Sequence, residues 1–273
     1  MKKNNSLILS APYIAWMVIF TLIPLGVVAY YAFTDPGTGA FSMKNILELQ
    51  NYLPVLWQSV LYSLISALIC LVLGYPVAYY IAHQGEVVQK ILYMLVMLPM
   101  CMSFLLRTLA WVGLLQDTGI INNLLGLVGI DPIRMIRTPG AVILGMVYNY
   151  LPYMILPLYA IIVKIDNRLI EAAEDLGCNG FHVFTKVVLP LSMPGILSGL
   201  TMVFVPAVST FYISQKLGGT DTVLIGDVIE RQFKQGNNAN LGAALSLLLM
   251  ILVFICTGIM NRLGADEEGG VVV

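Results

Sequence analysis

The chain has 273 residues, of which 59% are hydrophobic and only 11% are charged, and its mean hydropathy is +0.86. Soluble domains carry about a quarter charged residues, so this composition excludes a soluble protein and indicates an integral membrane protein. The net charge of −1, without a basic cluster, excludes a nucleic-acid-binding role. The four cysteines form no C-x-x-C pair, so neither a disulfide framework nor a metal site is predicted.

Six apolar runs are long enough to cross a bilayer, whose apolar core of about 30 Å needs about 20 helical residues. They are too long and continuous to be barrel strands. The sequence therefore predicts an all-α membrane protein with one transmembrane domain over residues 1–264 and a disordered tail over 265–273. The expected spans are about 11–33, 59–82, 91–115, 141–163, 194–213 and 241–262.

The first run follows Lys2 and Lys3 and resembles a signal peptide only superficially. Its apolar stretch is too long, and no small-x-small cleavage site follows it. We expect it to remain as an anchoring helix.

Several of the spans contain proline, which removes a backbone donor and can bend a helix. These prolines are Pro24, Pro76, Pro99, Pro152, Pro157 and Pro206. The loops on the outer side are expected near residues 34–58, 116–140 and 215–240, and residues 120–127 can form a short interfacial helix in the second of them.

The polar segment 164–190, between the fourth and fifth spans, is the most informative part of the chain. Leu169, Ala172, Ala173 and Leu176 recur at the spacing of one helix face. Asp166 or Asn167 can cap the start of this helix, and Gly177 stands where a left-handed residue would end it.

A second short helix is expected over about 180–188, capped by Asn179 and ending before Pro190. Two short helices would then meet at a glycine. An ordinary amphipathic interfacial helix is the alternative interpretation of the periodicity.

The residues of this segment also form a recognisable signature. Glu171-Ala172-Ala173, three residues, Gly177, nine residues, and then Val187, Leu189 and Pro190 resemble the coupling motif of binding-protein-dependent ABC importer permeases. Val187 stands where that motif usually has isoleucine. The resemblance covers most of the chain and is greatest to the spermidine/putrescine permeases. Its further supporting stretches are residues 73–78, 105–107, 139–148 and 224–229.

The resemblance implies a type I importer permease fold in which the segment between helices 4 and 5 is a cytoplasmic coupling helix. The ATPase-coupling residues would be Glu171, Ala172, Ala173, Gly177, Leu189 and Pro190. The implied partners are a dimer of ATPase subunits, a second permease subunit that often differs from the first, and an extracytoplasmic binding protein. The sequence has no phosphate-binding G-x-x-x-x-G-K-[ST]. The chain is therefore expected to be neither an enzyme nor a cofactor-binding protein, with ATP and magnesium held by the partner ATPase.

Charge counting does not orient the chain, because its 14 Lys and Arg divide equally between the two sides. Lys2 and Lys3 beside the first helix, and the need of the coupling segment to meet a cytosolic partner, place both termini in the cytoplasm. We expect a multi-pass protein of a prokaryotic plasma membrane.

Charges and aromatic rings near the spans are candidates for a substrate pathway, since charges in a membrane tend to face a cavity or a partner. We interpret Arg107 as snorkelling to the outer interface, with pairing to a carboxylate beside the pathway as the alternative. An arginine that faced the pathway unpaired would repel a cationic substrate. Carboxylates and aromatic faces suit the ammonium groups of polyamines. The candidate pathway residues are Arg107, Trp111, Asp117, Tyr148, Asn149, Asp227 and Glu230, beside the additional residues Tyr150, Tyr153, Tyr159 and Asp221.

Two alternatives stay open. The same machine could carry sulfate, iron(III) or phosphonates, although an anion would need inward basic residues, for which Arg107, Arg134 and Arg137 are the candidates. An ion-driven secondary transporter would show more helices or paired broken helices, and neither is evident.

Overall fold

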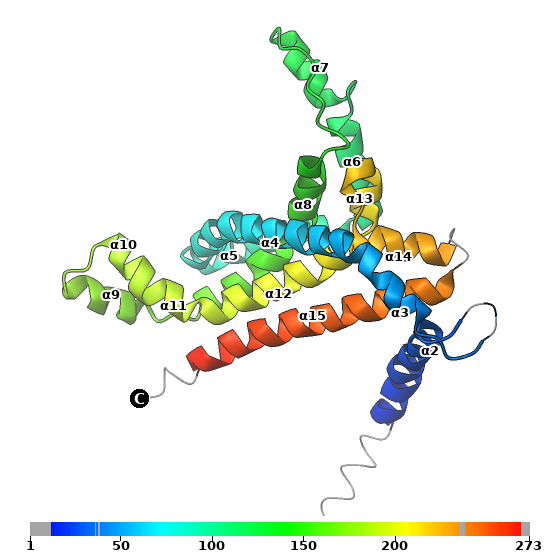
Figure 1. The fold of residues 1–273 in the computed structure, drawn as a ribbon. Coiled ribbons are helices and arrows are strands. Elements are labelled where there is room, and N and C mark those ends of the chain that lie inside the picture. Colours follow the sequence, from blue (N-terminus) through cyan, green and yellow to red (C-terminus); the bar gives the residue numbers. More distant parts are fainter. Residues whose placement is uncertain (1–11, 36, 38, 235–237, 269–273) are drawn as a thin grey trace, which may run out of the picture. The chain divides into compact units, whose positions relative to one another are not determined.

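The computed structural model describes residues 12–35, 37, 39–234 and 238–268, and these residues are mostly helical (Figure 1). Among them, five helices are long and apolar enough to cross a membrane, or six crossings if one bent pair counts as a span. The five are Pro12–Ala32, Lys44–Ala82, Phe104–Leu127, Pro139–Ile162 and Ala239–Met260, and the bent pair is Gly180–Leu191 with Met193–Ser209. The predicted all-α membrane fold is confirmed.

The chain divides into two compact units, where the sequence predicts one domain. Met1–Leu56 and Val228–Leu252 form the first unit, and Trp57–Asp227 and Val253–Val273 form the second. The difference arises because hydropathy locates apolar helices but does not reveal which of them pack together.

The first unit is held together by two buried asparagines that converge on the end of α2 (Ile23–Ala32), which continues the π-helix η1 (Val18–Leu22). Asn45 in α3 (Lys44–Glu48) donates to the carbonyls of Ala32 and Thr34, and Asn240 near the start of α15 (Ala239–Glu268) donates to the Thr34 carbonyl at 2.6 Å. The segment expected as a loop over 34–58 therefore contains α3, the 3-10 helix η2 (Leu49–Tyr52) and the start of α4 (Leu53–Ala82).

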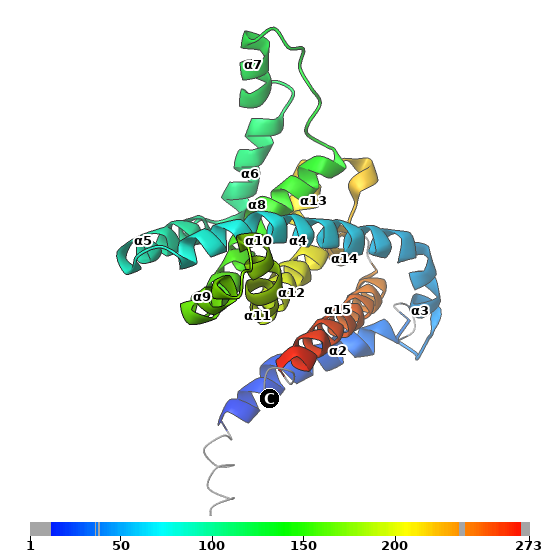
Figure 2. The same ribbon diagram turned by 90° about the vertical axis from the view of Figure 1, so that its left-hand side faces the viewer.

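The core of the second unit is the pair α8 (Pro139–Ile162) and α12 (Met193–Ser209), which lie side by side in Figures 1 and 2. Two glycines of α12 allow the close approach. A Cβ atom on Gly195 would lie 3.1 Å from the Pro157 carbonyl, and one on Gly199 would lie 2.6 Å from the Met154 sulfur. The Gly195-x-x-x-Gly199 spacing thus serves packing within this chain.

The helix expected over 91–115 is interrupted, and this part of the prediction is wrong. The structure has α5 (Glu86–Met97), the 3-10 helix η3 (Leu98–Cys101), an extended Met102 and then α6 (Phe104–Leu115). Pro99 provides the reason, because it lacks a backbone donor and cannot continue the helix from α5. The span in this region is Phe104–Leu127, which includes α7 (Ile120–Leu127).

α7 has the bounds that the sequence predicts, and it continues α6 away from α8 in both views. Asn122 fixes it: its side chain donates to the carbonyls of Gln116, Asp117 and Ile133 and accepts from the Ile133 amide. α7 is therefore a braced element.

The remaining helices follow the expected order with shifted ends. The predicted span 194–213 ends at Ser209, because Thr210 is extended, and α13 (Tyr212–Leu217) follows. The short η5 (Thr220–Thr222) leads to α14 (Ile225–Lys234). α15 reaches Glu268, so the first residues of the tail predicted to be disordered are helical, and residues 269–273 lie outside the described residues.

Candidate functional site: the elbow and the α6–α8 cluster

Residues 164–190, which we call the elbow, begin with α9 (Asn167–Asp175). The Asp166 carboxylate accepts a hydrogen bond from the Arg168 amide at 3.0 Å and so caps the first turn. At the other end the Gly177 amide donates to the Glu174 carbonyl and the Cys178 amide to the Ala173 carbonyl. These two bonds, with Gly177 at φ 84°, form a Schellman end, as the sequence predicts.

The second half of the elbow turns back along α9. Asn179 caps α10 (Gly180–Val183) by accepting from the His182 amide at 2.9 Å. The chain then widens into the π-helix η4 (Phe184–Val188), in which the Leu189 amide bonds to the Phe184 carbonyl. Pro190, in α11 (Leu189–Leu191), has no amide to offer the preceding turn, which accounts for the wide turn before it.

Much of the apolar stripe of α9 is exposed. Leu169 is 49% exposed and Leu176 is 86% exposed, while Ala172 is exposed and Ala173 is half-buried. Phe181 of α10 is 72% exposed. An exposed apolar surface of this kind is able to bind another molecule.

Glu171, Glu174 and Asp175 are exposed on the side of α9 away from this stripe, and Arg168 and Lys186 add exposed positive charges to the elbow. Of the other coupling candidates, Leu189 is half-buried at the start of α11 and Pro190 is exposed. The elbow therefore presents an apolar stripe together with charged side chains of both signs, which can pair with charges on a partner.

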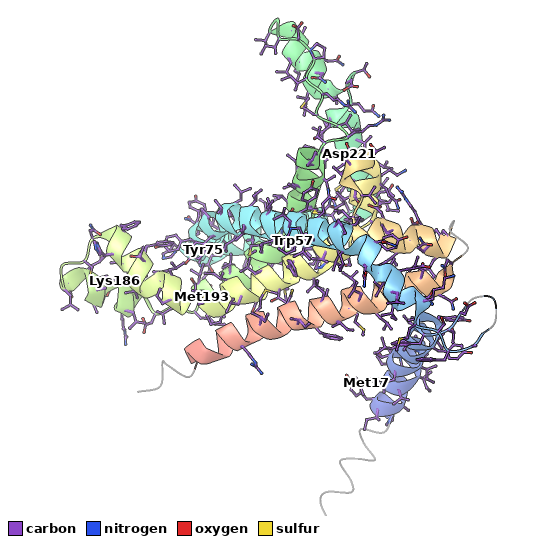
Figure 3. The ribbon with its side chains drawn as sticks, in the orientation of Figure 1. Met17, Trp57, Tyr75, Lys186, Met193 and Asp221 are labelled. Atoms are coloured by element: carbon purple, nitrogen blue, oxygen red, sulfur yellow. The ribbon has the colours of Figure 1, made fainter. Side chains whose placement is uncertain are left out.

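Where the elbow joins the membrane helices, the structure reveals a contact that no sequence motif indicates. The Tyr75 hydroxyl of α4 lies 2.8 Å from the Ser192 hydroxyl at the start of α12, and both side chains are buried. Figure 3 labels Tyr75, Lys186 of η4 and Met193 around this junction. The two bonded residues are 117 positions apart, so local patterning could not pair them.

The second candidate region lies where α6 contacts α8, and we call it the α6–α8 cluster: Arg107, Trp111, Tyr148, Asn149 and Tyr150. Arg107 is only 7% exposed, so the preferred interpretation of a snorkelling side chain is wrong. Its Nε and Nη1 atoms are buried without a hydrogen-bond partner among the described residues. The guanidinium lies within electrostatic reach of the Tyr150 hydroxyl, which donates to the Pro206 carbonyl at 3.3 Å.

One turn further along α6, Trp111 meets Tyr148 edge-on, with ring centroids 5.4 Å apart. Asn149 is 1% exposed and donates to the Gly145 carbonyl at 2.9 Å, while its Oδ1 has no partner among the described residues. The cluster thus combines aromatic faces with polar atoms that are shielded from lipid and solvent. Four of the seven pathway candidates lie on these two contacting helices, and a contact between two of them, Trp111 and Tyr148, is observed.

The three acidic candidates lie elsewhere. Asp117 is exposed at the turn between α6 and α7. Asp227 is 1% exposed, and one of its oxygens accepts from the Leu224 amide at 3.0 Å at the start of α14. Glu230 belongs to the first unit and pairs with Lys234 at 2.6 Å. The carboxylates of the last two therefore have structural bonds of their own.

Comparison with known proteins places this geometry in context. Residues 73–265 match the family described as "Binding-protein-dependent transport system inner membrane component", a range that includes the whole elbow. The chain is 40% identical over 254 residues to the spermidine/putrescine transport system permease protein PotB of Haemophilus influenzae, covering 88% of this chain and 89% of that protein. It is 37% identical to PotB of Escherichia coli K12, covering 88% and 90% of the two chains.

The fold is shared with a solved importer. The crystal structure of a bacterial ABC transporter involved in the import of the acidic polysaccharide alginate contains a chain with a TM-score of 0.81 and 19% identity, covering 97% of this chain and 96% of that one. At that identity the likeness concerns the fold alone. The family match over most of the chain and the two relatives decide the assignment: the chain belongs to the inner-membrane components of binding-protein-dependent transport systems, the permease subunits of ABC importers.

Proposed function

We propose that this permease carries polyamines of the spermidine and putrescine type into the cytoplasm. The observation that carries the proposal is the 40% identity, over nearly the whole length of both chains, to a spermidine/putrescine permease. Residues 1–264 would work as one transmembrane domain that alternates between outward-open and inward-open states.

The α6–α8 cluster suits a cationic cargo. Aromatic faces such as those of Trp111 and Tyr148 attract ammonium groups, and Tyr148 is 37% exposed. Arg107, which would repel a polyamine if it faced the pathway, is instead buried within the protein. In this proposal the cluster borders the pathway, with Arg107 turned away from the cargo.

The elbow would couple transport to ATP hydrolysis by a partner subunit. Its exposed leucines and carboxylates would dock into a groove of a cytoplasmic ATPase dimer that holds ATP and magnesium. The elbow and both chain termini would then lie in the cytoplasm. A second permease subunit would complete the pathway, and an extracytoplasmic binding protein would deliver the substrate. The chain itself would hydrolyse nothing.

The test is uptake of radiolabelled spermidine and putrescine into proteoliposomes that contain this chain with its partner permease, ATPase and binding protein. Enclosed ATP is compared with a non-hydrolysable analogue, and sulfate, iron(III) and phosphonate are tested in parallel. Polyamine uptake that requires hydrolysis supports the proposal. If only one of the other substrates is taken up in a hydrolysis-dependent way, the chain is still an ABC importer permease, but the polyamine proposal is rejected.

A further inference from the structure

The chain changes direction sharply where the elbow enters the membrane domain. Gly180–Leu191 and Met193–Ser209 meet at an angle of 64°. Two prolines account for the break, because Pro190 and Pro194 cannot donate to the preceding turns and a π-helix adjoins the first of them. Such a joint would be a loose hinge unless other contacts fixed its angle.

Those contacts come from α4. Ser192, at the joint, donates its hydroxyl proton to the Leu189 carbonyl at 2.9 Å, which leaves its oxygen free to accept from Tyr75 at 2.8 Å. Ser192 is 0% exposed and Tyr75 is 7% exposed. A buried hydrogen bond between side chains of this kind is costly to break without a replacement partner.

An aromatic contact also joins α4 to the elbow, through η4. The Phe184 ring of η4 meets Tyr75 edge-on at 5.4 Å and Tyr79 edge-on at 6.2 Å, so it is seated against two successive turns of α4. These geometries are favourable for aromatic pairs. We call Tyr75, Phe184 and Ser192 the clamp.

On its α9 side, the elbow is less tightly packed against the membrane helices. A cavity of about 300 Å³ lies between α9 and the ends of α4 and α8. Its lining includes His83, Gln89, Ile162, Asn167, Ile170 and Val188. Because packed side chains transmit displacement and voids absorb it, a push on α9 reaches α4 through η4 and the clamp.

We propose that the clamp is the element that makes α4 move with the elbow, so that Tyr75, Phe184 and Ser192 are positioning residues for energy coupling. This inference rests on the proposed function, because it takes the elbow to be driven by an ATPase. It assigns the clamp no contact with the cargo.

The first test measures how much ATP is hydrolysed per spermidine imported by reconstituted complexes. Tyr75→Phe removes only the bonded hydroxyl, and the matched control Tyr80→Phe makes the same change on the neighbouring tyrosine, which is 60% exposed. We expect the ratio to rise about three- to tenfold in Tyr75→Phe, the range that corresponds to losing one hydrogen bond. The control should have the same ratio as the parent. Both variants should bind as much ATPase as the parent does.

Ser192→Ala should raise the ratio at least as much, because it also removes the bond to the Leu189 carbonyl and leaves the buried Tyr75 hydroxyl without its partner. The double variant Tyr75→Phe with Ser192→Ala should be no worse than Ser192→Ala alone. Phe184→Leu keeps an apolar side chain but removes the ring, and should also raise the ratio. A clamp variant with the parental ratio would overturn the proposal. A parent that imports no polyamine would instead reject the proposed function.

The second test does not depend on the cargo. Spin labels are placed on cysteines at Val72, which is 71% exposed on α4, and at Lys186, which is exposed on η4, after the native cysteines have been replaced. With the clamp intact, the distance between the labels should have a narrow distribution in lipid nanodiscs, and Tyr75→Phe or Phe184→Leu should at least double its width. Equal widths in the parent, in both clamp variants and in Tyr80→Phe would overturn the proposal.

Discussion

The elbow and the α6–α8 cluster differ in where their important side chains lie and in how the chain builds them. In the elbow, Leu169, Leu176 and Phe181 lie on the surface, and short-range hydrogen bonds set the backbone. In the cluster, Arg107 and Asn149 are buried, and helices from distant parts of the chain supply the contacts. The difference shows that the backbone of the elbow is set locally and tolerates exposed side chains, as the proposed docking role requires, whereas the cluster depends on the packing around it.

The largest effect should come from the glycine that turns the elbow. Gly177→Val places a β-branched residue at φ 84°, which costs about 1–2 kcal/mol or more, a factor of about 5 to 30. We expect spermidine uptake to fall about tenfold with an unchanged amount of protein in the membrane.

Gly180→Val is the matched control for that variant. Gly180 begins α10 without a positive φ, and a Cβ atom at either glycine would meet open space. Uptake by the control should stay near the parental rate. Parental uptake by Gly177→Val would contradict the proposed docking role of the elbow.

An intermediate effect is expected from the aromatic pair of the cluster. Trp111→Ala removes the edge contact with Tyr148, an interaction worth about 0.5–1.5 kcal/mol beyond the buried area. The KM for spermidine uptake should rise about three- to tenfold. Trp57→Ala, at a tryptophan that is 69% exposed, is the control and should leave KM unchanged. If the two variants behave alike, the cluster does not border the pathway.

A smaller effect should follow from removing the cap of α9. Asp166→Ala deletes the acceptor for the Arg168 amide, which costs about 1 kcal/mol of helix stability. Uptake should fall about two- to fivefold, with spermidine KM unchanged because the proposed role of the elbow involves no contact with the cargo. Asp131→Ala, at another exposed aspartate, serves as the control. A change in KM would argue against separate roles for the two regions.

The smallest loss of spermidine uptake is expected from Arg107→Met. The substitution removes a buried guanidinium whose Nε and Nη1 lack partners among the described residues, and an unpaired buried charge costs free energy. The unfolding midpoint should stay the same or rise by about 2–4 °C, and spermidine uptake should persist. Arg134→Met, in an exposed position, should change neither quantity.

A lowered midpoint in Arg107→Met would show that the guanidinium has an essential partner, and the cluster would then be a structural ion-pair site. Loss of uptake at an unchanged midpoint would place Arg107 in the pathway itself, as an anion carrier requires. Either result would change the comparison between the two regions.

Local signals in the sequence were reliable where the structure is local. Asp166, Gly177 and Asn179 occupy the cap and turn positions that their residue types predict, because those hydrogen bonds span only two to five residues. At Pro99 the same local reasoning failed, because the span predicted over 91–115 is interrupted there. Proline in a membrane helix can bend or end it, and only the surrounding packing decides which; here α5 ends.

The placement of side chains was less predictable. Arg107, near the outer end of an apolar run, has the sequence context of a snorkelling residue, yet the contact between α6 and α8 buries it. The pairing within the clamp has no sequence signal, since nothing local connects Tyr75 to Ser192 until α4 and α12 are brought together.

The sequence by itself thus determined the membrane class, the approximate spans and the two capped helices of the elbow, because hydropathy and capping act over at most about one helix length. Only the tertiary structure decided which helices pack, that the chain divides into two units, that Arg107 is buried and that Tyr75 holds the joint at Ser192. Those properties depend on contacts between residues far apart in the chain, and in a membrane protein nearly every span is apolar enough to fit several neighbours.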